Sequence, residues 1–300
     1  PRTEGPEEVG EGEPGRQLQQ RERVSAGARE VARPPGARGR DHAREAVARR
    51  ERHGLLGGRE RRDVLAAEEP ERGEAGDERP RIEAGGVLHA RERLLRATDE
   101  VQHLREQGVR DDRVLAALLH VPRHLFVEEA LASRAYEDTA LPLGLQQTIS
   151  QPFVVARMLE LLLAGRESLG KTLEVGTGCG YQAAVMASLA SDVYSVERLR
   201  LLLDRARANL RHLRLPNVRL KHADGSVGLK DAAPFDTIIV AAAAPKVPPA
   251  LVEQLAEGGR LILPVGMAEQ VLVLIERTVR GPKETRLSPV RFVPLLPGTE

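Results

Sequence analysis

The pattern of apolar and polar positions in the second half of the chain predicts strands that alternate with helices. A short apolar run over about residues 171–176 ends in a glycine-rich turn, and an alanine-rich helical pattern over about 179–190 follows. Further strands are expected over residues 192–197, 218–222, 235–240 and 260–265, and the run over 235–240 is nearly all apolar. Helical patterns lie between several of these runs, with apolar residues three and four positions apart. Together they predict an α/β fold with a doubly wound, Rossmann-like sheet and right-handed crossovers.

The end of the chain follows a different pattern. Two late apolar runs, at about 270–277 and 288–296, have no helical pattern between them. We therefore expect a C-terminal antiparallel strand pair at the edge of the sheet.

The segment before the glycine turn is helical at first and then irregular. Helical patterns over about 91–120 break at Gly108, and Asp111 or Asp112 suits the N-cap of the second helix. Residues 136–152 follow neither period, so we expect a long loop whose single aliphatic residues pack onto the domain. Pro152 suits the first position of the next helix, which makes Ser150 a plausible helix cap.

The first 90 residues differ in composition from the rest. They are rich in Arg, Glu, Gly, Pro and Ala and contain no aromatic residue. Such a segment cannot bury enough apolar surface to offset its ordering entropy, so we expect a disordered extension over 1–90 and a folded domain over 91–300. An Arg-rich arm for nucleic acid is one alternative. Another is an upstream stretch joined by an ill-chosen start, because the chain begins at Pro1, its first Met is Met158, and Val87 could mark a truer beginning.

Composition and charge narrow the class of protein. The formal net charge of +1 gives no global electrostatic reason to expect nucleic acid. A single cysteine, Cys179, cannot form an internal disulfide, which suits a reducing compartment. No apolar run reaches membrane-spanning length and no signal peptide opens the chain, so we expect a soluble cytoplasmic protein without a membrane partner. The histidines show no metal-ligand spacing, and no metal is expected.

Residues suited to ligand binding end or follow three consecutive predicted strands. Gly176, Gly178 and Gly180 form the turn after the first, Glu197 ends the second, and Asp224 follows the third. A carboxylate at Glu197 can accept hydrogen bonds from both hydroxyls of a ribose, and Asp224 could bind an adenine amino group. Each residue also has a structural explanation, as a turn, a helix start or a turn acid. Together they indicate an adenosine-containing ligand without a pyrophosphate. They therefore favour S-adenosylmethionine over NAD as the ligand.

From about residue 95 to its end, the chain resembles protein-L-isoaspartate O-methyltransferase. The stretches that carry the resemblance are residues 121–127, 141–144, 147–152, 173–181, 195–198, 224–225, 233–236, 263–266 and 290–295. The glycine turn is shared by many methyltransferases, whereas the Thr-Ile-Ser-Gln-Pro segment at 148–152 is specific to this family. The N-terminal extension has no counterpart in the family.

The resemblance implies a protein repair enzyme. Its relatives use S-adenosyl-L-methionine to methylate the α-carboxyl of L-isoaspartyl residues in unfolded or aged proteins. The nucleophile is the substrate carboxylate, which is ionised near neutral pH, so no strong general base is needed. We also expect a monomer without a nucleic-acid partner. Two alternatives remain open, a methyltransferase of another carboxylate or small molecule and an Arg-rich nucleic-acid-binding protein with a scaffold domain.

The resemblance also implies roles for individual residues. Ser150 stands at the family's active-site position, and its hydroxyl would bind the isoaspartyl carboxylate or orient the cofactor. The substrate contacts implied are Thr148, Ile149, Ser150 and Val293. The cofactor contacts implied are Gln147, Thr148, Glu174, Gly176, Thr177, Gly178, Gly180, Glu197, Asp224 and Gly225. One departure stands out, because Gln146 occupies a position where relatives commonly carry glycine, and a positive φ there would be costly.

Overall fold

The fold was determined as a computed structural model, which describes residues 90–300. The expected extension over 1–90 falls on residues outside the described part of the chain except for Ala90, where the first described helix begins, and the suggested start near Val87 lies outside it as well.

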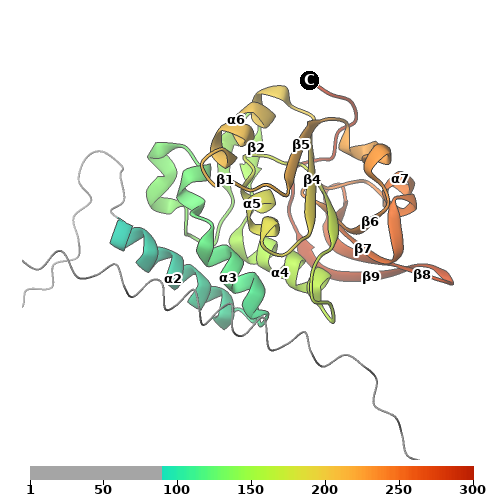
Figure 1. Cartoon of the computed structure of the whole chain (residues 1–300), viewed down its shortest axis with the longest axis horizontal. Coiled ribbons are helices and arrows are strands. Elements are labelled where there is room, and N and C mark those ends of the chain that lie inside the picture. Colours follow the sequence, from blue (N-terminus) through green and yellow to red (C-terminus); the bar gives the residue numbers. More distant parts are fainter. Residues whose placement is uncertain (1–89) are drawn as a thin grey trace, which may run out of the picture. The chain divides into compact units, whose positions relative to one another are not determined.

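A seven-stranded sheet forms the centre of the domain (Figure 1). Its strand order is β5-β4-β3-β6-β7-β8-β9, with parallel pairing from β5 through β7 and antiparallel pairing of β7 with β8 and of β8 with β9. The strands are β3 (Lys171–Val175), β4 (Asp192–Glu197), β5 (Val218–His222), β6 (Phe235–Val240), β7 (Leu255–Gly266), β8 (Gln270–Thr278) and β9 (Gly281–Val290). The doubly wound, Rossmann-like fold with antiparallel C-terminal strands is therefore confirmed.

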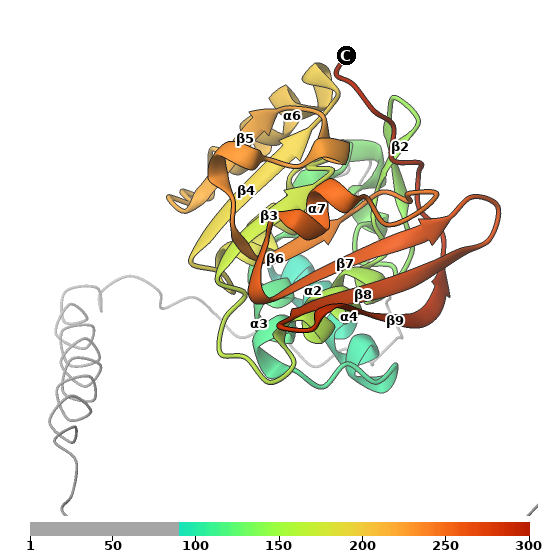
Figure 2. The ribbon, with the colours of Figure 1, turned by 90° about the vertical axis from the view of Figure 1, so that its right-hand side faces the viewer.

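Helices cover both faces of this sheet (Figures 1 and 2). They are α2 (Ala90–Glu106), α3 (Asp112–His120), α4 (Pro152–Leu163), α5 (Tyr181–Ala187), α6 (Arg200–Leu210) and α7 (Pro249–Glu253), with short 3₁₀ turns η1 (Arg123–Phe126), η2 (Glu129–Arg134), η3 (Gly225–Val227) and η4 (Lys230–Ala232). Asp111 caps α3 by accepting from the backbone N–H of Arg113, as the sequence predicts. None of the helices in the described range is long and apolar enough to pass through a membrane.

Two hydrophobic cores lie on opposite faces of the sheet. One core joins α3, α4 and α5 to sheet residues that include Ile239 and Ile262. The other contains Leu251 of α7 together with Leu173 and Ile238. Neighbouring residues of β6 thus point into different cores, as successive side chains of a strand must. This two-sided burial explains why the central strands read as nearly continuous apolar runs.

The last strand differs from the prediction. We expected a strand over 288–296, but β9 spans Gly281–Val290 and residues 291–296 leave the sheet. This segment pairs instead with the loop after β6, where Ala243 donates to the Val293 carbonyl and Leu295 donates to the Ala243 carbonyl. An edge strand can keep polar side chains in solvent, so the polar residues 283–286 gave no apolar signal.

The long loop expected over 136–152 contains a β-hairpin. Strand β1 (Leu141–Gly144) pairs antiparallel with β2 (Gln147–Ile149), and a two-residue turn joins them. The expectation of an irregular loop was therefore wrong, because strands this short show almost no periodicity. The expectation that its aliphatic residues pack inward is confirmed for Leu141, Leu143 and Ile149, which are buried, but not for Leu145, which is exposed in the turn.

Helix α4 follows this hairpin, and its ends are fixed by distant side chains. Pro152 is its first residue, as predicted, but Ser150 does not cap it. The carboxylate of Asp138 does so, with Oδ1 accepting from the Phe153 N–H at 2.8 Å and Oδ2 accepting from Gln151 Nε2 at 2.9 Å. Ser150 lies two residues before the helix, one position too early for an N-cap.

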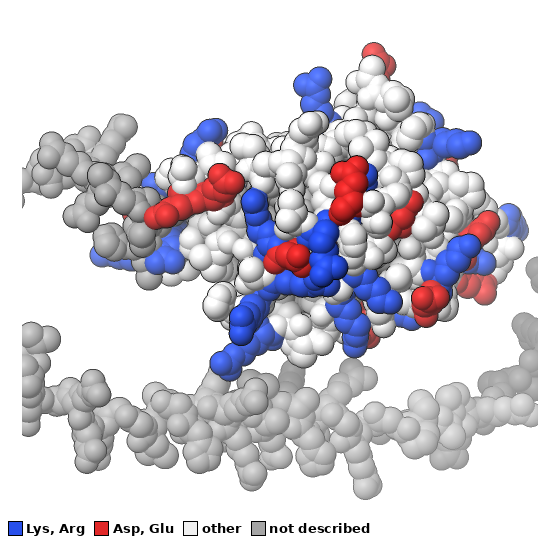
Figure 3. Space-filling view, turned by 90° about the horizontal axis from the view of Figure 1, so that it is seen from above, with Lys and Arg blue, Asp and Glu red and all other residues white. Residues whose placement is uncertain are grey.

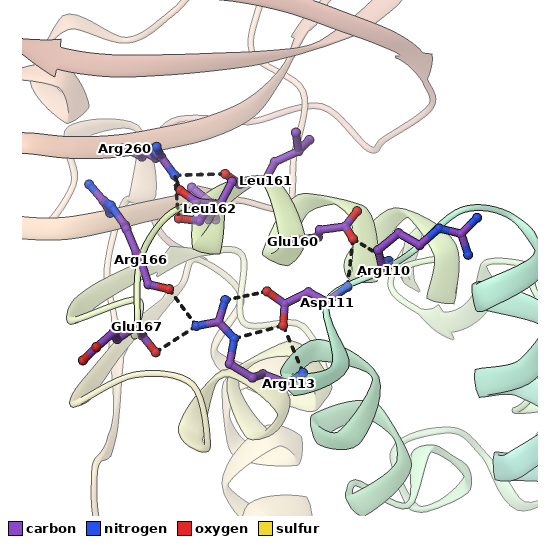
Figure 4. Close-up of polar contacts among 10 residues, drawn as sticks. Arg110, Asp111, Arg113, Glu160, Leu161, Leu162, Arg166, Glu167 and Arg260 are labelled. Carbon is purple, nitrogen blue, oxygen red and sulfur yellow. Dashed lines mark hydrogen bonds and ion pairs between the residues drawn. The ribbon is translucent and has the colours of Figure 1, made fainter.

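At the other end of α4, Arg260 of β7 donates from Nη1 to the carbonyls of Leu161, Leu162 and Ala164 (Figure 4). Near this end, Glu160 Oε1 accepts from the backbone N–H groups of Arg110 and Asp111 at the start of α3. These bonds satisfy helix-terminal groups that have no partner within a helix. Helix α4 is therefore tied to both the sheet and α3.

Candidate active site

The glycine turn follows β3 and leads into α5, as the sequence predicts. Gly176, Gly178 and Gly180 have φ values of 94°, 57° and 89°, a region that residues with a Cβ seldom adopt. Gly180 is the N-cap of α5, and a Cβ on it would lie 3.1 Å from a methyl of Leu210. The turn therefore needs glycine for its backbone conformation and for its close packing against α6.

A pocket opens beside this turn, at the carboxyl ends of β3, β4 and β6. Its wall includes most of the predicted site residues, namely Gln147, Thr148, Ile149, Ser150, Gly176, Thr177, Gly178, Glu197, Gly225 and Val293. The other lining residues come mainly from the same turn, the starts of α5 and α6, and residues 293–296. Glu174, Gly180 and Asp224 are not on the wall. The returning C-terminal segment thus contributes to the pocket, which a strand over 288–296 would not explain.

Glu197 ends β4 with its carboxylate against the pocket. The residue is only 6% exposed, and its two oxygens accept from the backbone N–H groups of Gly178 and Leu199 at 2.9 and 3.0 Å. A carboxylate has about four acceptor positions, so two remain for a ligand. The same side chain therefore joins the glycine turn to the start of α6 and can still bind hydroxyl groups.

Glu174 lies beneath the glycine turn. It is fully buried, and its oxygens accept from Gln182 Nε2 at 3.0 Å and from the Ser195 hydroxyl. The Ser195 hydroxyl also lies 2.6 Å from Thr177 Oγ1, which belongs to the turn. Burial raises the pKa of Glu174 to about 8, although both hydrogen bonds favour the ionised form. The structure thus places this acid as a support for Thr177.

Asp224 follows β5, and both of its carboxylate oxygens have protein partners. Oδ1 accepts from the N–H and hydroxyl of Ser226 at 2.8 and 2.6 Å, and Oδ2 accepts from the Gly298 N–H at 2.6 Å. Asp224 therefore caps η3 and holds the last residues of the chain. The neighbouring Gly225 reaches the pocket wall, and a Cβ there would lie 2.3 Å from Val175 Cγ1.

Ser150 stands between the pocket and a second opening, a groove with a volume of about 890 Å³. Thr148, Ser150, Ala241 and Val293 line both openings. The groove is also lined by residues that the sequence did not predict, which include Phe153, Val154, Arg157, Leu272, Arg291 and Phe292. Arg291 and Phe292 belong to a stretch that resembles the family. They were not predicted near Ser150, because a strand over 288–296 would have kept them within the sheet.

Arg123 is a second residue near Ser150 that had no predicted role. Its guanidinium is fully buried, and Nη2 donates to the Ser150 carbonyl at 2.7 Å. An arginine followed by apolar residues in a short 3₁₀ segment carries no local sign of such a contact. Only the resemblance over 121–127 drew attention to this stretch.

The model of the protein-L-isoaspartate(D-aspartate) O-methyltransferase family matches residues 96–300. A protein-L-isoaspartate O-methyltransferase from Dechloromonas aromatica is 70% identical over 200 residues, which are 67% of this chain and 93% of that protein. One from Chromobacterium violaceum is 58% identical over 219 residues, which are 73% of this chain and 96% of that protein. The chain belongs to this methyltransferase family.

Solved structures of the same family share the fold. A crystal structure described as a protein-L-isoaspartate O-methyltransferase from Plasmodium falciparum in complex with S-adenosyl-L-homocysteine is 29% identical, with a TM-score of 0.60. The similarity covers 67% of this methyltransferase and 98% of that chain. A second structure of a protein-L-isoaspartate O-methyltransferase is 30% identical, with a TM-score of 0.61, over 66% of this chain and 65% of that one.

Proposed function

We propose that this enzyme transfers a methyl group from S-adenosyl-L-methionine to the α-carboxyl of L-isoaspartyl residues in damaged proteins. The family match over residues 96–300 supports this reaction. The structural observation that carries it is the junction of two openings at Ser150, one beside the glycine turn and one large enough for a peptide side chain and backbone. At such a junction, the methyl donor can bind in one opening and the substrate in the other, and their reacting atoms can come into contact at Ser150.

The residues around the pocket fit this cofactor. Glu197 has free acceptor positions for the two ribose hydroxyls, Gly176 and Gly178 leave room for the methionine part, and Gly225 lies on the adenine side. Arg198 is the one basic residue among the lining residues, and it donates to the Gly298 carbonyl and pairs with Glu300. A pyrophosphate-containing cofactor would find little compensation for its charge here. When bound, the cofactor supplies an electrophilic methyl group on a positively charged sulfur.

We further propose that Ser150 orients the substrate carboxylate. A hydrogen bond from its hydroxyl to one carboxylate oxygen leaves the other oxygen as the nucleophile. Thr148 and Ile149 form the partition on one side of the junction, and Val293 frames it on another. Because the carboxylate is already ionised near neutral pH, the protein has to position it and exclude water rather than remove a proton.

The reaction itself is tested with a pair of synthetic peptides that differ only in an isoaspartyl or an aspartyl residue. We expect methyl transfer to the isoaspartyl peptide and none above background to its aspartyl twin. Equal rates on both peptides would refute the substrate assignment. Heat release on titration with S-adenosyl-L-homocysteine tests the cofactor independently of the substrate.

The roles of Ser150 and Glu197 are separated by their variants. Ser150→Ala should lower kcat by about 10- to 100-fold, because an ill-placed reacting group can lose about two orders of magnitude in rate. Glu197→Ala should weaken S-adenosyl-L-homocysteine by about 10- to 100-fold, since a hydrogen bond to a charged group contributes about 1.5–3 kcal/mol. Ser188→Ala is the matched control, because Ser188 lies at the C-terminal end of α5, lines neither opening, and donates from its hydroxyl to the Val185 carbonyl. The opposite pattern of kcat and affinity would show that the two roles are exchanged.

We also propose that the enzyme acts as a cytoplasmic monomer on unfolded or aged proteins. Asp204 on α6 pairs with both Arg200 and Arg207. On the face seen in Figure 3, acidic side chains lie among the basic ones, which favours a peptide substrate over a nucleic acid. Sedimentation of the purified enzyme with and without peptide tests the monomer.

A further inference from the structure

A buried polar cluster lies behind Ser150, and the proposed methyl transfer has no step that uses it. It contains Arg123 of η1, Glu100 of α2 and Tyr181 of α5, and none of the three is more than 4% exposed. Among the described residues, four of their buried polar atoms have no hydrogen-bond partner: Arg123 Nη1, both carboxylate oxygens of Glu100 and the Tyr181 hydroxyl. A buried polar group without a protein partner is costly, so the retention of these groups requires an explanation.

The guanidinium of Arg123 contacts both sides of the active site. On the substrate side, Nη2 donates to the Ser150 carbonyl and Nε donates to the Ala135 carbonyl, both at 2.7 Å. On the cofactor side, Cζ lies 4.7 Å from the centre of the Tyr181 ring. Tyr181 is the first residue of α5, directly after the glycine turn, and it lines the cofactor pocket. One rigid side chain therefore spans the two segments that must bring the reactants together.

The position of Ser150 makes this contact important. The residue lies between β2 and α4, where the chain changes from a strand to a helix. Asp138 holds the following residues through Gln151 Nε2 and the Phe153 N–H, and the β1–β2 pairing holds Ile149 before it. Arg123 holds Ser150 itself. A planar group with several donors at fixed angles can do this, whereas a lysine ammonium cannot reach both carbonyls with the same geometry.

We propose that Arg123 is a positioning residue for methyl transfer, which sets the place of Ser150 relative to the glycine turn. The proposal rests on the proposed role of the Ser150 hydroxyl. Glu100 faces Arg123 from α2, and Asp138 and Tyr136 also lie within electrostatic range of this cluster. Burial raises the pKa of Glu100 to about 8, against the attraction of Arg123. The carbonyls of Ser150 and Ala135 and the Tyr181 ring therefore provide much of the compensation for the buried cation.

The test is a double-mutant cycle between Arg123→Lys and Ser150→Ala, measured as kcat with the isoaspartyl peptide. We expect Arg123→Lys to lower kcat by about 10- to 100-fold in the Ser150 enzyme, as expected for a displaced reacting group. In the Ser150→Ala enzyme, the same change should lower kcat by less than about threefold, because residues that act through one another are not additive. The affinity for S-adenosyl-L-homocysteine should change less than kcat in both backgrounds.

Arg260→Lys is the matched control. Arg260 donates to backbone carbonyls at the opposite end of the same helix, far along α4 from Ser150. We expect Arg260→Lys to lower Tm and leave kcat unchanged below the Tm of the variant. A merely structural role of Arg123 would give the same behaviour.

Arg123→Met is a second variant, since an apolar side chain of similar length avoids burying an uncompensated charge. It should lose kcat as Arg123→Lys does. A kcat within about threefold of the parent enzyme, or the same loss in both Ser150 backgrounds, overturns the role of Arg123. Failure of both Arg123 variants to fold assigns the residue to the core and also overturns it. If Ser150→Ala alone leaves kcat unchanged, the proposed role of Ser150 fails first.

Discussion

Replacing Gln146 by glycine should stabilise the hairpin that carries the active-site segment. Leu145 and Gln146 form its two-residue turn with φ values of 52° and 57°, so both occupy the left-handed region. Two positive φ values are the mark of a type I′ turn, which prefers Asn or Gly. Gln146 is exposed and makes no hydrogen bond to the described residues, so the substitution removes strain without removing a contact.

The size of the effect follows from the backbone alone. A residue with a Cβ in the left-handed region lowers the free energy of unfolding by about 1–2 kcal/mol. Glycine removes this strain, but its greater freedom in the unfolded chain lowers the free energy of unfolding by about 0.5–1 kcal/mol. The net gain is about 1 kcal/mol, which raises Tm by about 2–4 °C for a domain of this size. Because the turn leads directly into β2, which holds Thr148 and Ile149, a firmer hairpin should also lower KM for the peptide, by about two- to fivefold.

Arg214→Gly provides the matched control. Arg214 is also exposed and has a φ of 49°, but it follows α6 and lines neither opening. Thermal unfolding and peptide kinetics on the two variants separate strain from function. Both variants should raise Tm, and only Gln146→Gly should change KM. A lower Tm for Gln146→Gly beside a higher Tm for Arg214→Gly would show that the hairpin turn is not strained.

Glu174 and Gly225 lie close to the pocket, and a substitution at each should change the stability of the domain. Burial raises the pKa of Glu174 to about 8, so between pH 4.5 and 8 the native state retains a proton that the unfolded chain loses, and stability falls as pH rises. As pH rises through this range, the free energy of unfolding of Glu174→Gln should therefore increase relative to that of the parent enzyme by at most about 1.4 kcal/mol per pH unit. Urea unfolding at pH 6 and 8 measures this difference. Gly225→Ala would place a Cβ 2.3 Å from Val175 Cγ1, so we expect a loss of about 1–3 kcal/mol in unfolding free energy and weaker S-adenosyl-L-homocysteine binding by calorimetry.

Three parallel strands were predicted well, although β4 and β6 are largely buried while β5, at the edge of the sheet, has no buried residue. The predicted ranges 192–197, 218–222 and 235–240 match β4, β5 and β6 residue by residue. Helix ends were less well predicted, since α5 spans 181–187 rather than 179–190. Burial on both faces gives β6 its clear apolar run, whereas the last turn of a helix depends on which groups are free to cap it.

The hairpin and the edge strand were missed for opposite reasons. Strand β1 has four residues and β2 three, and the Leu145-Gln146 turn lacks the Asn or Gly that usually reveals such a hairpin. Strand β9 is long, but its polar side chains give no apolar alternation. In both segments the tertiary pairing, and not the local sequence, decides the conformation.

The site was predictable where chemistry follows chain order and unpredictable where distant segments meet. The glycine turn and the acid about twenty residues later mark the ends of adjacent strands, which must lie together in a parallel sheet. Asp138 and Arg123 reach the start of α4 from 15 and 27 residues away, at Phe153 and Ser150. No spacing rule connects such pairs, because a loop and a 3₁₀ turn bring them together.

The three acids at the strand ends show that depth, and not residue type, decides their roles. Glu174 is fully buried, and Ser195 and Gln182 use its oxygens, so it can act on a ligand only through the turn above it. Asp224 has both oxygens occupied by Ser226 and Gly298, so an adenine amino group would have to share them with backbone N–H groups. Glu197 alone of the three lines the pocket with acceptor positions left over. We therefore expect direct contact with the ribose from Glu197, and a loss of turn rigidity rather than of a ligand contact when Glu174 is changed.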